Sequence, residues 1–162
     1  MARHNQLRLV LHGGLFMVIS MVAAGIPGFV AATHHLINDP IRQFFRQSHS
    51  IFMATGIWMI ATAPVLSWLG LTARGIASLV WSLVISGYTF LVALIVLFIG
   101  FQLHAPSANE EQWKTLMAMP GHLGWIYIWL VALSGSASLV AGALIVRGAY
   151  KAAQKPLSDF VH

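Results

Sequence analysis

The chain has 162 residues, of which 58% are hydrophobic and only 8% are charged, and a soluble domain of this size could not bury so much apolar side chain. A net charge of +5 would suit a nucleic-acid partner, but the basic residues flank long apolar runs, which instead favours a lipid bilayer and no nucleic acid. Because the sequence has no cysteine, disulfides, thiolate metal sites and cysteine nucleophiles are excluded.

Four stretches meet the length of roughly 20 mostly apolar residues that a helix needs to cross the hydrocarbon core. The predicted spans are 7–32, 50–71, 76–103 and 121–146. Every backbone polar group must be paired within lipid, and the alternating polarity of a β-barrel strand is missing, so we expect helices. The sequence therefore predicts an all-α fold in which residues 1–162 form one polytopic bundle of four transmembrane helices.

The connections between these spans differ in length. The first, 34–47, contains a turn signal at Asp39-Pro40, followed by a short segment at 41–46 that suits an interfacial helix. The second and third spans are joined only by 72–75, which predicts a tight antiparallel hairpin.

Lysine and arginine are distributed unevenly between the two ends of the spans. One side carries Arg3, Arg8, Arg74, Arg147, Lys151 and Lys155, and the other carries Arg42, Arg46 and Lys114. Because the more basic side of a membrane protein faces the cytoplasm, we expect a multi-pass protein of the inner (cytoplasmic) membrane with both termini cytoplasmic.

Small residues recur at four-residue spacing in two of the spans. The third span has Ser78, Ser82 and Ser86, and the fourth has Ser134, Ser138 and Gly142. Such faces let helix backbones approach closely in lipid. They are compatible with packing inside the bundle and with packing between subunits of an oligomer.

Histidine carries the most specific chemical signal. His49 opens the second span, and Met53 and Gly56 follow on the same helix face, so an imidazole stands above a notch where a flat group could lie. A neutral imidazole is a good ligand for haem iron. The alternative is an interfacial histidine bonded to water or to a neighbouring carbonyl.

The other histidines suggest different roles. A zinc or copper site could combine histidines near the outer ends of the spans, namely His34, His35, His104 and His122. Adjacent histidines rarely point at one metal, however, and His12 is typical of a histidine bonded across a helix contact. The predicted spans contain no acidic or basic residue away from their ends, which argues against an ion-coupled transporter or proton pump.

Several stretches, in the same order and spacing over nearly the whole chain, resemble the styrene oxide isomerase family of small four-span membrane enzymes. They are LHGGLFM at 11–17, RQSHS at 46–50, PVLSWLGL at 64–71, PG at 120–121 and VAGALIVRGAY at 140–150. The resemblance implies a homotrimer that binds haem b between subunits, with His49 as the axial metal ligand. Met53 and Gly56, on the same helix face as His49, would then lie against the cofactor. The resemblance also implies that ferric iron acts as a Lewis acid, opening an aryl epoxide to an aldehyde by a hydride shift.

The chain departs from the family pattern at three polar positions. Thr55 stands where the family has an asparagine, Ser86 where it has an aspartate, and Leu94 where it has a tyrosine, with Tyr88 nearby. The resemblance implies that Thr55, Ser86 and Tyr88 line the open face of the haem and orient a small apolar substrate, as the catalytic residues. Two alternatives stay open: a haem-binding electron-transfer or sensor subunit, and a cofactor-free structural or transport protein.

Overall fold

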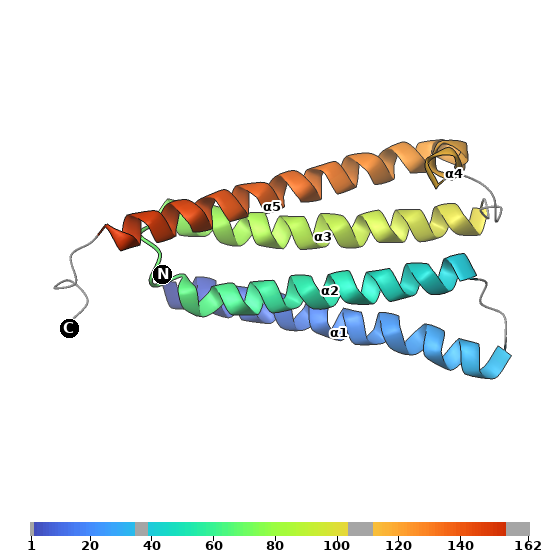
Figure 1. Cartoon of the computed structure of the whole chain (residues 1–162), viewed down its shortest axis with the longest axis horizontal. Helices are drawn as coiled ribbons and strands as arrows, with labels where there is room; N and C mark the ends of the chain where they lie inside the picture. Colours follow the sequence, from blue (N-terminus) through green and yellow to red (C-terminus); the bar gives the residue numbers. More distant parts are fainter. Residues whose placement is uncertain (1, 35–38, 104–111, 155–162) are drawn as a thin grey trace.

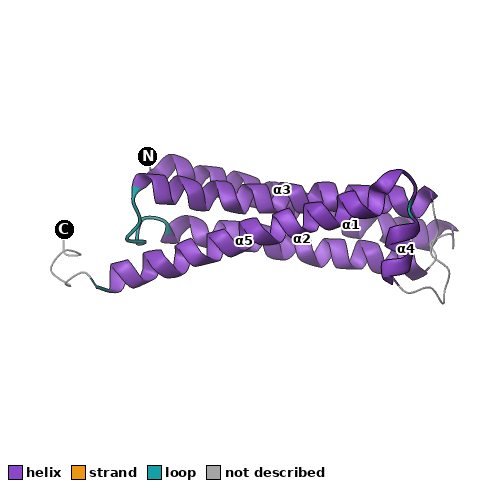
Figure 2. Cartoon of the chain, turned by 90° about the horizontal axis from the view of Figure 1, so that it is seen from above, coloured by secondary structure: helices purple, strands orange, loops and turns teal. Residues whose placement is uncertain are grey.

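The computed structural model describes residues 2–34, 39–103 and 112–154, and in these ranges every regular element is helical (Figures 1 and 2). The elements are α1 (Ala2–His34), α2 (Asp39–Val65), α3 (Ala73–Leu103), α4 (Gln112–Ala118), a short 3₁₀ helix η1 (Pro120–His122) and α5 (Leu123–Ala153). The predicted all-α fold is confirmed for the described part of the chain.

Within the described residues, three helices are long and apolar enough to cross a membrane. The qualifying stretches are Arg3–Val22, Ala73–Gly100 and Pro120–Ala153, which belong to α1, α3 and η1–α5. Long helices of this composition indicate a membrane-embedded protein. Helix α2 does not join this group, although its stretch from Ser48 to Val65 carries no charged residue, because polar residues such as Ser48 and His49 lower its hydropathy.

The bounds of α2 differ from the predicted span. The helix begins at Asp39 and includes 41–46, so that segment is not a separate interfacial helix, and it ends at Val65 rather than at residue 71. Pro64 lies in its last turn, where the missing N–H removes one helical hydrogen bond. Beyond it the chain turns, with the Trp68 N–H donating to the Val65 carbonyl over 2.9 Å.

The long helices pack as two pairs, α1 along α2 and α3 along α5 (Figure 1). The predicted tight hairpin between the second and third spans is wrong, because α2 and α3 touch only sparsely. Residues 66–72 instead lead the chain onto the end of α5. There the Gly70 N–H donates to the Gly148 carbonyl over 3.0 Å, and Leu69 and Leu71 pack against Gly148. The start of α1 and the end of α5 lie at this same end of the bundle.

Helices α1 and α2 approach to backbone contact. A Cβ atom built on Gly13 would lie 2.8 Å from the carbonyl oxygen of Gly56, and one built on Gly56 would lie 2.7 Å from that of Gly13. Real Cβ atoms essentially never come so close to backbone. One turn away, the buried rings of Phe16 and Phe52 stack with centroids 6.0 Å apart. The crossing therefore requires glycine on both helices.

A serine cluster joins α3 to α5. The Ser86 hydroxyl lies 2.6 Å from that of Ser138 and 3.2 Å from that of Ser134, and Ser134 donates to the Ser86 carbonyl over 2.8 Å. These three serines therefore pack between helices of one chain. For them, the sequence left open packing within the bundle or between subunits, and the first is found. Gly142 differs, since a Cβ built there would meet nothing within 4 Å.

The glycine crossing leads to a stability prediction. Gly13→Val should separate α1 from α2 and lower the free energy of unfolding by about 1–3 kcal/mol, the usual cost of overpacking. Gly14→Val is the matched control, because a Cβ there meets nothing within 4 Å, and it should change stability by about 0.5 kcal/mol at most. Denaturant titration in mild detergent measures both. Equal losses for the two variants would contradict the crossing.

Candidate cofactor site at His49

The imidazole of His49 on α2 is held by a single residue of α1. Its Nδ1 atom lies 2.9 Å from the carbonyl oxygen of Ser20 and 2.8 Å from the Ser20 Oγ. The Ser20 hydroxyl in turn donates to the carbonyl of His49 over 2.8 Å. Ser20 is fully buried, whereas His49 keeps part of its surface exposed.

These contacts fix the tautomer of the neutral ring. The carbonyl oxygen of Ser20 can only accept, so its 2.9 Å contact with Nδ1 is a hydrogen bond only when Nδ1 carries the hydrogen. The Ser20 hydroxyl is then left to donate to the His49 carbonyl. Nδ1 must then carry the hydrogen, which leaves the lone pair on Nε2. No hydrogen bond to Nε2 is found among the described residues. The bond to a neighbouring carbonyl that the alternative interpretation of His49 requires is thus present, and it leaves the other nitrogen able to bind a metal.

The remaining cofactor residues lie on the same helix in different surroundings. Met53 and Thr55 are partly buried. Gly56 is buried directly beneath α1, so the notch expected beside it is filled by the backbone and side chains of that helix, including Met17. A flat group against this chain would therefore have to lie on another part of the surface around His49, because the Gly56 face is already occupied.

Ser86 and Tyr88 face different neighbours, because residues two positions apart lie on nearly opposite faces of an α-helix. Ser86 is bonded to α5 through Ser138, whereas the hydroxyl of Tyr88 lies 3.0 Å from His12 Nδ1 on α1. The prediction that His12 bonds across a helix contact is confirmed. Tyr88 therefore faces α1 and Ser86 faces α5, and neither hydroxyl is bonded to His49.

Aromatic rings connect the Tyr88 region to the helix of His49. Tyr88 packs on Phe16 with centroids 5.1 Å apart, and Phe16 stacks on Phe52, which follows His49 by one turn. Phe90 of α3 also meets Phe52, edge to face, at 6.5 Å. Leu94 is buried in the apolar core. The surroundings of Phe52 are therefore apolar and aromatic.

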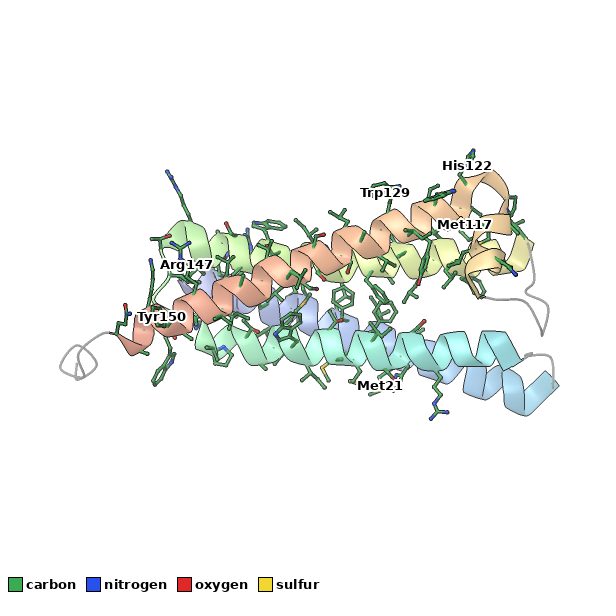
Figure 3. All side chains as sticks on the ribbon, turned by 45° about the horizontal axis from the view of Figure 1, so that its top comes forward. Met21, Met117, His122, Trp129, Arg147 and Tyr150 are labelled. Atoms are coloured by element: carbon green, nitrogen blue, oxygen red, sulfur yellow. The ribbon has the colours of Figure 1, made fainter. Side chains whose placement is uncertain are left out.

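The alternative metal site at the outer histidines lies largely outside the described residues. His35 and His104 are not described, nor is the side chain of His34. His122 is exposed and points away from the bundle near α4, at the end opposite Arg147 and Tyr150 (Figure 3). The described part of the chain holds no group of three or more histidine, aspartate or glutamate residues that could bind a metal ion.

Sequence reasoning singled out His49 but missed Ser20. The two residues are 29 positions apart, and only the pairing of α1 with α2 brings them together. Ser20 shares a helix face with Gly13 and Phe16 and is buried there, but the sequence carries no signal that pairs it with His49.

Comparisons of this chain with models of known protein families, with curated proteins and with solved structures found no match. The functional argument therefore depends on the motifs of the sequence and on the geometry around His49.

The His12–Tyr88 bond joins the two helix pairs, and its strength can be measured. Tyr88→Phe should lower the free energy of unfolding by roughly 0.6 kcal/mol, and by no more than about 1.7 kcal/mol, the range for side-chain bonds between membrane helices. A double-mutant cycle with His12→Phe should show that the two losses are not additive. Strict additivity would mean that the two side chains do not interact.

Proposed function

We propose that this chain is a haem-b-dependent membrane isomerase that converts an aryl epoxide to an aldehyde. The observation that carries the proposal is the hydrogen bonding of His49. Its Nδ1–H donates to Ser20, and the lone pair of Nε2 stays available. Histidine ligands of metals usually have their second nitrogen engaged in this way. The motif resemblance around His49 supplies the identity of the cofactor and the reaction class.

The proposed assembly is a homotrimer of four-span subunits in the inner membrane, with both termini cytoplasmic. Helix α2 would be the fourth span, because its 27 residues rise about 40 Å, more than the ~30 Å hydrocarbon core, and it lies along α1. The cofactor would lie between subunits and without the predicted contact to Gly56, because α1 fills that face.

In this proposal His49 Nε2 would hold the metal, and ferric haem, when bound there, would supply a Lewis acid for the epoxide oxygen. The apolar side chains around Phe52 exclude water, which would otherwise attack the electron-poor carbon and give a diol. Thr55, Ser86 and Tyr88 remain the groups proposed to orient the substrate oxygen. Ser86 and Tyr88 would have to exchange Ser138 and His12 for the substrate to do so.

That exchange favours a second candidate function. A haem-binding electron-transfer or sensor subunit needs no polar group on the substrate side, so it is compatible with Ser86 and Tyr88 serving only as helix contacts. Such a subunit would share His49 and would recruit a second axial ligand. The two candidates therefore predict different coordination of the same iron.

The absorption spectrum after titration with haem b tests both. The isomerase should show an open-site ferric spectrum, and His49→Ala should lose the haem or change its coordination while the protein still inserts. His12→Ala, which removes an imidazole from a helix contact remote from His49, should leave the spectrum alone. Membranes with the wild-type protein should turn styrene oxide into phenylacetaldehyde, and His49→Ala should abolish this.

Three results would contradict the proposed isomerase or its assigned iron ligand. A six-coordinate low-spin spectrum with no turnover favours the electron-transfer or sensor subunit. An unchanged spectrum in His49→Ala, with loss in a variant of His34, His35, His104 or His122, would move the ligand elsewhere. A wild-type protein with no haem spectrum at all would leave the cofactor-free structural or transport protein.

A further inference from the structure

We propose that Ser20 is a positioning residue that sets the tautomer and orientation of His49 and thereby the electron density at the metal it binds. This inference rests on the proposed function, since it assigns a role to a second residue of the same site. Ser20 meets His49 through two oxygen atoms at 2.8 and 2.9 Å from Nδ1, and through its own donation to the His49 carbonyl.

The contact is a consequence of helix register. Along the antiparallel pair, Gly13 meets Gly56 and Phe16 meets Phe52, and Ser20 meets His49 one further turn along. Each contact lies one helical turn beyond the previous one on both helices, so the first two contacts determine the third. Ser20 therefore reaches His49 because of the close glycine crossing, and α1 as a whole acts as the support of the ligand helix.

Burial strengthens the effect of this contact. Ser20 has no exposed surface, so water does not compete for its hydroxyl or for the face of its carbonyl that meets Nδ1. Ser20 satisfies the ring hydrogen and also ties the His49 backbone through its carbonyl. The imidazole is then restrained both at the ring and at the main chain, which keeps Nε2 in one direction.

The chemical consequence follows from the hydrogen bond at Nδ1. When Nδ1–H donates a hydrogen bond to an acceptor, the ring gains negative character, and Nε2 becomes a stronger base and metal ligand. A more basic ligand stabilises the ferric state over the ferrous state and lowers the reduction potential. A ferric Lewis acid is the state that the proposed isomerase requires, so Ser20 would help keep the enzyme in its active oxidation state.

The test compares Ser20→Ala, Ser20→Thr and Ser20→Val in the haem-loaded protein. Thr and Val have nearly the same shape, so only the hydroxyl distinguishes them. Ser20→Ala and Ser20→Val should weaken haem binding by about tenfold, the lower end of the range for such partners, because the backbone carbonyl at position 20 still accepts from Nδ1. Both should raise the reduction potential, and Ser20→Thr should stay closer to wild type on both measures.

Ser136→Ala is the matched control, because the Ser136 hydroxyl donates only to the Ala132 carbonyl of its own helix, over 2.8 Å. It should leave affinity and potential unchanged. If the wild type binds haem through His49 but Ser20→Ala has wild-type affinity and potential, the inference is wrong and the proposed function stands. If affinity falls while the potential does not move, or if Thr and Val behave alike, Ser20 only packs, and the inference is wrong. If the wild type binds no haem, both proposals fail.

Discussion

Helices α1 and α2 can lie in backbone contact only because neither Gly13 nor Gly56 has a side chain. Lipid acyl chains are as apolar as the side chains, so the hydrophobic effect does not drive helices together within the bilayer. Close packing of this kind is therefore a main source of helix association. The contact fixes the register of the pair, and the register places Phe16 on Phe52 and Ser20 on His49. The state of the His49 imidazole is thus decided by two glycines about two turns away.

The polar side chains described inside the bundle are largely paired across helices or back onto their own. His12 bonds to Tyr88 between the two helix pairs, and Ser86 bonds to Ser138 within the second pair. An unpaired polar group in hydrocarbon is expensive, so these bonds stabilise the bundle. They also restrict chemistry, since a hydroxyl that holds two helices together reaches a substrate only by giving up its partner. His49 differs, because one nitrogen is satisfied and the other keeps its lone pair.

The sequence predicted the helical class and the positions of the long apolar runs, because length and hydropathy alone determine them. It did not predict the pairing of helices. A short connection after Leu71 suggested a hairpin, whereas the docking of Gly70 and Leu71 on Gly148 turns the chain towards α5. His49 could be chosen from its place at the start of an apolar run. Ser20 could not, since its partner depends on the register of two helices and not on spacing along one.

The tautomer of His49 in the metal-free protein tests the account most directly, because the proposed site and the role of Ser20 both depend on it. Nitrogen-15 NMR of histidine-labelled protein in bilayers above the pH at which imidazole is protonated distinguishes a ring N–H from a bare nitrogen. Comparison with His49→Ala identifies this residue among the eight histidines. The account predicts a protonated Nδ1 and a bare Nε2, and a hydrogen on Nε2 with a bare Nδ1 would contradict it.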